Sequence, residues 1–150
     1  MSGTLAGIAR HPRPKAPMET VARARVTLEE GVHGDFRGAM KGKPYKRQVT
    51  LIERGDWDTA IAAVGHNVGW EERRVNLLID GLDLPQRPGA RLRVGTALLE
   101  VTAECDPCNR MDAIADGLQA ALKADWRGGV CSKVVEAGEI AVGDPVIIEE

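Results

Sequence analysis

Residues 91–111, RLRVGTALLEVTAECDPCNRM, hold most of the local signals that decide the fold. Two short apolar runs, residues 91–94 and 97–103, are separated by a glycine and predict a β-hairpin with a tight turn. The second run leads into Cys105 and Cys108, which bracket an Asp-Pro pair, and a helical pattern follows at once. The stretch therefore predicts two strands, a thiol-bearing loop and a helix, in that order.

Strand patterns recur on both sides of this stretch. Residues 21–28, VARARVTL, alternate between apolar and polar side chains, as a half-buried strand does. One face of that strand would carry Ala22, Ala24, Val26 and Leu28. Further strands are predicted at residues 3–9, 48–53, 74–79, 128–135 and 145–149.

Two segments carry helical patterns instead. Residues 56–64 begin at Asp56, a candidate N-cap, and stop at Gly65. Residues 111–122 place apolar side chains at helical spacing, and Asn109 with Asp112 resembles a capping box. Seven or eight short strands, two helices and no regular βαβ alternation predict a mostly β fold, a barrel or sandwich with peripheral helices.

Composition narrows the class of protein. The chain has 150 residues, 43% hydrophobic and 28% charged, as expected for one globular domain. A net charge of −2 and few aromatic residues argue against a nucleic-acid partner and against attraction to an anionic membrane. No apolar segment approaches the ~20 residues needed to span a bilayer, and no signal peptide is recognisable. We therefore expect a cytoplasmic protein with reduced cysteines.

Cys105 and Cys108 allow several chemistries. A structural zinc site needs four ligands, but the chain offers one C-x-x-C, a distant Cys131 and three histidines without partner spacing. A redox dithiol fits the local order of strand, C-x-P-C and helix, although the upstream hairpin is foreign to thioredoxin-like folds. A single reactive thiolate is the third possibility. Burial of both cysteines as small apolar side chains is the unreactive alternative.

Cys108 is the better candidate for a reactive sulfur. It precedes Asn109 at the predicted helix start, where backbone N–H groups stabilise a thiolate, and Arg110 adds a cation. These features favour Cys108 as a nucleophile or metal ligand. They leave Cys105 open between function and packing.

Two polar segments could bind an anion. A glycine-rich loop without acidic residues concentrates the cations Arg37, Lys41, Lys43, Lys46 and Arg47. Such a loop can cradle a phosphate or oxyanion, or it can simply be solvated; it contains no Walker A or dinucleotide fingerprint. The predicted strand 74–79 follows Arg73 and places Arg74 and Asn76 on one face. That face suits a cleft for a heterocycle or phosphate, and equally the wet face of an ordinary strand.

The ordered set of segments resembles the MOSC domain, the family named after the C-terminal domain of molybdenum cofactor sulfurases. The pieces that carry the resemblance are GVHGDFRG, KRQVTLIE, RRVNLLIDGLDL, VGTALLEVTAECDPCNRM and WRGGVCSKVVEAGEIAVGD. The resemblance implies one domain over residues 1–150, with a core at about 3–148 and a β-barrel fold.

The resemblance also implies roles for particular residues. Cys108 falls on the family's cysteine, which accepts sulfur as a persulfide from a pyridoxal-phosphate-dependent sulfurase or ligates molybdenum. Asp35 matches the acid of the family's G-D motif, and Arg74 and Asn76 match its R-x-N segment. With the cations above, the expected cofactor-binding residues are Asp35, Arg37, Lys46, Arg47, Arg74, Asn76 and Arg110.

Three functions are expected from these features. In the first, Cys108 carries sulfur for molybdenum cofactor or metal–sulfur cluster metabolism, with a cysteine desulfurase or other donor as partner. In the second, the chain binds molybdopterin, uses Cys108 as the molybdenum ligand, and reduces N-hydroxylated compounds with redox partner proteins. In the third, Cys105 and Cys108 form a thiol redox sensor. No pyridoxal phosphate is expected in this chain itself.

Overall fold

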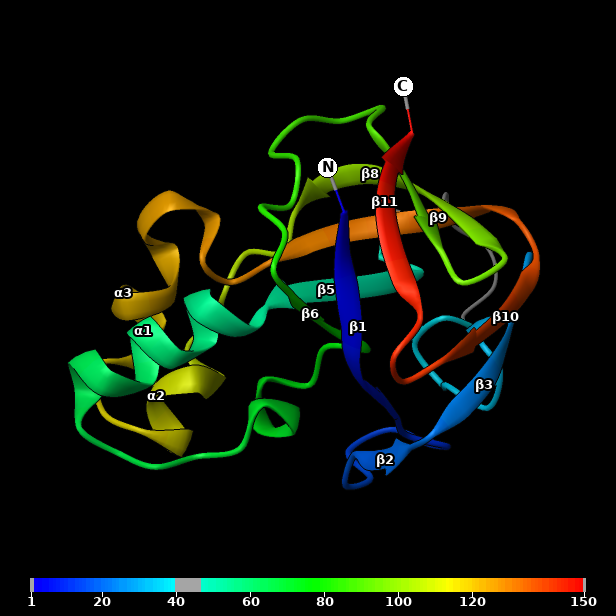
Figure 1. Cartoon of the computed structure of the whole chain (residues 1–150). Helices are drawn as coiled ribbons and strands as arrows, with labels where there is room; N and C mark the ends of the chain where they lie inside the picture. The colour runs from blue at the N-terminus through cyan, green and yellow to red at the C-terminus, as the bar shows by residue number, and fades with distance from the viewer. Residues whose placement is uncertain (1, 40–46, 150) are drawn as a thin grey trace.

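Seven strands close into a β-barrel in the computed structural model, which describes residues 2–39 and 47–149 (Figure 1). Around the barrel the order is β11-β7-β8-β9-β5-β6-β1, and β1 pairs again with β11 to complete the ring. The barrel strands are β1 (Ser2–Arg10), β5 (Val49–Glu53), β6 (Leu77–Asp80), β7 (Arg91–Val94), β8 (Ala97–Glu104), β9 (Val130–Glu136) and β11 (Pro145–Glu149).

The other strands lie at the margins of the barrel. The short strand β2 (Glu19–Val21) pairs with the end of β1, outside the ring. A second sheet has the order β10-β3-β4 and consists of β10 (Gly138–Ala141), β3 (Arg23–Thr27) and β4 (Gly31–Val32). β5 and β6 are the parallel pair among the described barrel strands, and the chain between them supplies a helical crossover.

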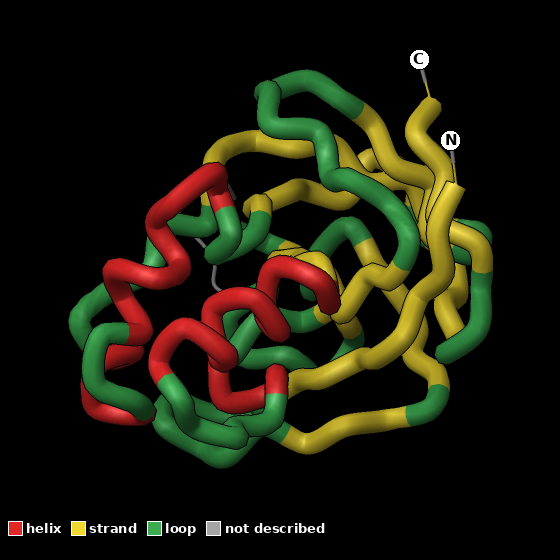
Figure 2. Tube along the Cα trace, turned by 60° about the vertical axis from the view of Figure 1, so that its left-hand side comes forward, coloured by secondary structure: helices red, strands yellow, loops and turns green. Residues whose placement is uncertain are grey.

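The helices gather on one side of the barrel, away from β3 and β10 (Figures 1 and 2). They are α1 (Arg54–Val64), α2 (Arg110–Ile114), α3 (Leu118–Lys123) and the 3₁₀ turns η1 (Trp70–Arg73) and η2 (Ala124–Trp126). Within the described chain, none of them is long and apolar enough to cross a membrane.

Strand alternation divides the core into two apolar clusters. On β5, Leu51 points into the barrel, whereas Ile52 faces the helices. The helix-facing cluster also holds Trp57 of α1 and both buried cysteines, Cys105 and Cys131. The prediction of a mostly β barrel with peripheral helices is therefore confirmed.

Several local predictions need correction. The single helix expected over residues 111–122 is two short helices, because Gly117 adopts a left-handed conformation (φ 85°) between them. Asn109, the expected N-cap, makes no side-chain capping bond, and Asp112, its expected capping-box partner, instead accepts the Gln119 N–H at 3.0 Å. Helix α1 begins at Arg54, so Asp56 lies in its first turn rather than at the N-cap. Leu28, expected to face the core, is 54% exposed.

Candidate functional site

A hollow of about 240 Å³ opens beside the exposed thiol of Cys108. We call it the arginine pocket, and its lining consists of Arg37, Arg47, Arg73, Arg74, Asp106, Cys108, Arg110 and Met111. Four separate segments contribute: the loop after β4, the turn two residues before β5, the end of η1, and the β8–α2 loop with the first residues of α2. Five guanidinium groups against one carboxylate make this a site for an anion.

The β8–α2 loop holds Cys108 at the mouth of the pocket. The Cys108 carbonyl accepts the Met111 N–H at 3.0 Å, which starts the first turn of α2. The preceding Pro107 is tied to α3, since its carbonyl accepts the Gln119 side-chain amide at 3.2 Å. Helix α2 spans only five residues, so its dipole contributes little at the Cys108 sulfur.

Arg73 forms the inner wall of the pocket, although its sequence pattern did not favour it over Arg74 as a site residue. Its side chain is buried and donates to the carbonyls of Cys105 (2.8 Å) and Gly128 (3.0 Å). A Cβ on Gly128 would lie only 2.7 Å from the Cys105 carbonyl, so the glycine permits this packing. The available signal for a buried, hydrogen-bonded Arg73 was its position next to a run of apolar residues.

Arg74 does not lie in a strand, contrary to the prediction for residues 74–79. It ends η1 in a left-handed conformation (φ 66°), and β6 begins only at Leu77. This turn lets two consecutive arginines line the same pocket, which a strand would have sent to opposite faces.

Asn76 is buried inside the barrel wall and does not line the pocket. Its side-chain oxygen accepts the backbone N–H of Thr50 at 3.0 Å and the Thr50 hydroxyl at 3.2 Å. Its amide group donates to the Ala9 carbonyl at 3.1 Å. The side chain thus links β1, β5 and the segment before β6. The prediction that Asn76 and Arg74 share one face of a strand is therefore wrong.

Asp35 lies behind the pocket and shapes the loop that carries Arg37. Its carboxylate accepts the backbone N–H groups of His11 and Gly38, each at 3.1 Å. The His11 ring lies 3.2 Å from the same carboxylate, and burial lowers the pKa of His11 below its ordinary value. Asp35 is therefore a buried anchor of the loop, at 2% exposure, and lines no part of the pocket.

The cations of the pocket crowd one another. Burial lowers the pKa of Arg37, and the positive charges of Arg47 and Arg110 lower it further, against the opposing effect of Asp35. A bound anion would relieve this repulsion, which favours occupancy by a multiply charged group.

The structure therefore brings together five of the expected site residues: Cys108, Arg37, Arg47, Arg74 and Arg110. Asp35 and Asn76 stand apart from them, as described above. Lys46, expected as a cofactor ligand, lies outside the described residues, as do Lys41 and Lys43 of the same loop.

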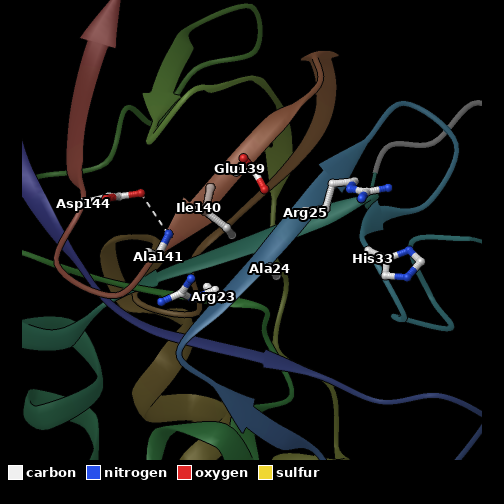
Figure 3. A pocket seen from close by; sticks show the side chains of 8 residues that line it. All are labelled: Arg23, Ala24, Arg25, His33, Glu139, Ile140, Ala141 and Asp144. Carbon is white, nitrogen blue, oxygen red and sulfur yellow. Dashed lines mark hydrogen bonds between the residues drawn. The ribbon is translucent and has the colours of Figure 1, made fainter.

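A second hollow, of about 420 Å³, lies over β3 and β10 (Figure 3). Arg23 and Arg25 of β3 and Glu139 of β10 all line it, so both signs of charge are present. Asp144 at its edge is already engaged, since it accepts the Ala141 N–H at 2.8 Å. The lining includes no cysteine, so the arginine pocket is the candidate functional site.

Fold and pocket together define a small β-barrel protein with an anion site beside a cysteine thiol. The model of the MOSC domain family matches residues 19–147. The chain therefore belongs to the MOSC domain family, and this membership supports a role related to the molybdenum cofactor.

Solved structures of similar fold include three bacterial proteins, each 17% identical to this chain. The YuaD protein of Bacillus subtilis has a TM-score of 0.78, over 97% of this chain and 94% of that one. YiiM of Geobacillus stearothermophilus has a TM-score of 0.76 (99% and 75%), and YiiM of Escherichia coli 0.72 (100% and 70%). At this identity the likeness concerns the fold. A search of the curated proteins gave no match.

The residues of the pocket fit the cofactor with which the family is associated. Guanidinium groups suit the phosphate of a pterin cofactor, and a cysteine thiolate suits molybdenum. The buried Nε of Arg73 has no hydrogen-bond partner among the described residues.

Proposed function

We propose that this protein is a sulfur carrier of molybdenum cofactor or metal–sulfur cluster metabolism, and that Cys108 holds the sulfur as a persulfide. The supporting observation is the exposed Cys108 thiol at the mouth of a pocket lined by five arginines. A persulfide and the phosphate of a cofactor are both anions. One cationic pocket would therefore suit both the persulfide on Cys108 and the cofactor that accepts its sulfur.

The loading step is a thiolate–persulfide exchange. The Cys108 thiolate attacks the outer sulfur of a persulfide on a cysteine desulfurase. The donor's S–S bond breaks, its thiolate leaves with the electron pair, and Cys108 keeps the sulfur with its hydrogen. Atoms and charge balance without an external oxidant, because the sulfur changes only its bonding partner.

The arginines would serve the exchange in two ways. The cations that line the pocket would attract the anionic donor site and hold the transferred persulfide. Arg110 lies two residues beyond the thiol and lines the same pocket, so it would help to hold the transferred persulfide.

Mass spectrometry tests the carrier. The protein is incubated with a pyridoxal-phosphate-dependent cysteine desulfurase and free cysteine, and its mass is measured without reductant. We expect wild type to gain one sulfur atom and Cys108→Ser to gain none. Cys131→Ser, altered at a buried cysteine, is the matched control and should still gain it. Equal gain by wild type and Cys108→Ser would overturn the proposal.

A second candidate uses the same pocket differently: a molybdenum-cofactor oxidoreductase acting on N-hydroxylated compounds. It is favoured by the guanidinium groups that line the pocket, which would hold a cofactor phosphate, with Cys108 as the molybdenum ligand. Bound molybdenum would supply two-electron reduction, and the chain's own arginines would hold and orient the cofactor.

Metal and pterin analysis separates the two candidates. The protein is purified from cells that synthesise the cofactor, and molybdenum and pterin are measured per chain. Stoichiometric amounts that disappear in Cys108→Ser would support the oxidoreductase. If neither molybdenum nor pterin is present in stoichiometric amounts, the oxidoreductase is excluded and the sulfur carrier is retained.

A further inference from the structure

A second cysteine, Cys105, lies buried directly behind the arginine pocket. Two guanidinium groups contact its sulfur, Arg73 Nη2 at 3.5 Å and Arg47 Nη2 at 3.6 Å. The Cys131 thiol adjoins both the Cys105 sulfur and the Glu104 carbonyl, the latter at 3.7 Å, and its single S–H can donate to either. Cys131 reaches Cys105 from the neighbouring strand β9, and Cys105 itself has no solvent exposure. The fixed donors at Cys105 are thus the two guanidinium groups, and the S–H of Cys131 is a further donor shared with the Glu104 carbonyl.

This arrangement indicates the charge of the sulfur. A guanidinium can only donate hydrogen bonds, so a sulfur that contacts two of them is an acceptor. Arg73 is 5% exposed, and among the described residues no carboxylate forms an ion pair with it. A buried cation without a counter-charge is costly, and a thiolate at Cys105 would supply the missing negative charge.

We propose that Cys105 is a thiolate in the folded protein and serves as an internal anion of the arginine pocket, where it competes with incoming anions for Arg47 and Arg73. Both arginines line the pocket on one side and contact Cys105 on the other. The proposal does not depend on sulfur transfer by Cys108.

The electrostatics of the two cysteines agree with this geometry. The hydrogen bond from Cys131 and the charges of Arg73 and Arg47 lower the pKa of Cys105 to about 6, against burial, which acts in the opposite direction. The same hydrogen bond and burial raise the pKa of Cys131, so Cys131 stays protonated as the donor. The thiolate is therefore present at neutral pH and lost as the pH falls below about 6.

Competition implies that anion binding and protonation of Cys105 are linked. An anion that draws charge from Arg47 and Arg73 raises the proton affinity of the thiolate, and a proton on Cys105 favours the anion equally. The other charged groups at the pocket are Arg37, Arg74, Arg110, Asp106 and Cys108. Cys108→Ser removes the second thiol, so the remaining titration can be assigned.

The first test counts thiolates. Ultraviolet absorbance of the thiolate is followed from pH 4.5 to 9 in Cys108→Ser protein and in Cys108→Ser/Cys105→Ser protein. We expect one thiolate to appear near pH 6 in the former and to be missing in the latter. Absence of a Cys105-dependent thiolate below pH 8 would overturn the proposal.

The Cys131 variants test the donor without altering Cys105. Cys131→Ala, in the Cys108→Ser background, should raise the titration midpoint by about one to two pH units, the worth of a hydrogen bond to a charged group. Cys131→Ser keeps a donor and should restore a midpoint near that of the parent. Equal midpoints in the parent and both variants would show that Cys131 donates nothing to a thiolate.

The second test measures competition with sulfate, which stays doubly charged over this range. In Cys108→Ser protein, calorimetric sulfate affinity at pH 5.5 should exceed that at pH 7.5 by about three- to tenfold, a coupling of ordinary size. In the Cys105→Ser double variant the two affinities should be equal. An affinity that is independent of pH while Cys105 is present would refute the competition.

Discussion

Replacing Asn76 by alanine tests whether this residue is a structural joint or a ligand-binding group. The change removes the acceptor for the Thr50 N–H (3.0 Å) and the donor to the Ala9 carbonyl (3.1 Å) in a site that is 5% exposed. A buried N–H left without a partner costs ~1–3 kcal/mol, and loss of the second hydrogen bond adds about 1 kcal/mol. We therefore expect Asn76→Ala to lower the free energy of unfolding by about 3 kcal/mol, a large part of the ~5–15 kcal/mol available to a domain.

Urea unfolding, followed by circular dichroism, measures this loss. The midpoint should fall while the slope of free energy against urea stays unchanged, because the surface exposed on unfolding is the same. Asn67→Ala, on the exposed loop after α1, is the matched control and should change stability by less than about 0.5 kcal/mol. Sulfate affinity of the folded variant should equal that of wild type. A loss under ~1 kcal/mol for Asn76→Ala, or selective loss of sulfate binding, would refute the structural interpretation.

Two further predictions concern Glu53, the last residue of β5, and Gly129, the residue before β9. Burial raises the pKa of Glu53 from 4.5 to about 7, so charging this carboxyl costs the folded protein stability as the pH rises through that range. Glu53→Gln should therefore stabilise the protein by about 1 kcal/mol at pH 8 and have no effect at pH 4. Urea unfolding at both pH values measures the difference. A gain that is the same at both pH values would contradict this. Gly129 (φ 102°) would place a Cβ 2.0 Å from the Leu51 carbonyl, so Gly129→Ala should cost about 3 kcal/mol by thermal or urea unfolding. Gly65→Ala, also at positive φ but with open space around it, should cost only about 1 kcal/mol, and equal losses would show that the contact with Leu51 is unimportant.

Much of the barrel was predictable because local sequence patterns, apolar runs bounded by turn residues, indicate its strands. Residues 145–149 were expected as a strand and form β11 with the same bounds, since a glycine-bearing turn precedes an apolar run. The broken helix was not predicted, although Asp116-Gly117 is a turn signal inside the helical stripe. The prediction followed the apolar spacing and ignored the glycine, whereas in the structure an extended Ala115 ends α2 and the left-handed Gly117 precedes α3.

The candidate site was harder to predict, because its geometry depends on partners distant in sequence. Arg37, Arg47 and Arg110 could be suspected from charge alone, and the fold brings them to Cys108. No local rule places Arg74 at positive φ, a conformation that few non-glycine residues adopt. Asn76 in an apolar run fitted a ligand site and a buried joint equally well, and only its contacts with strands β1 and β5 distinguish them.

The four-segment origin of the arginine pocket has a kinetic consequence. Its walls come from positions between 37 and 111, joined by barrel pairings that are remote along the chain. Long-range pairing is slow to form, and a half-assembled barrel has no complete ring of guanidinium groups. Recovery of sulfate affinity during refolding should therefore lag behind the return of strand signal in circular dichroism. An anion that binds this pocket would then bind only the fully folded protein, and would stabilise it against unfolding.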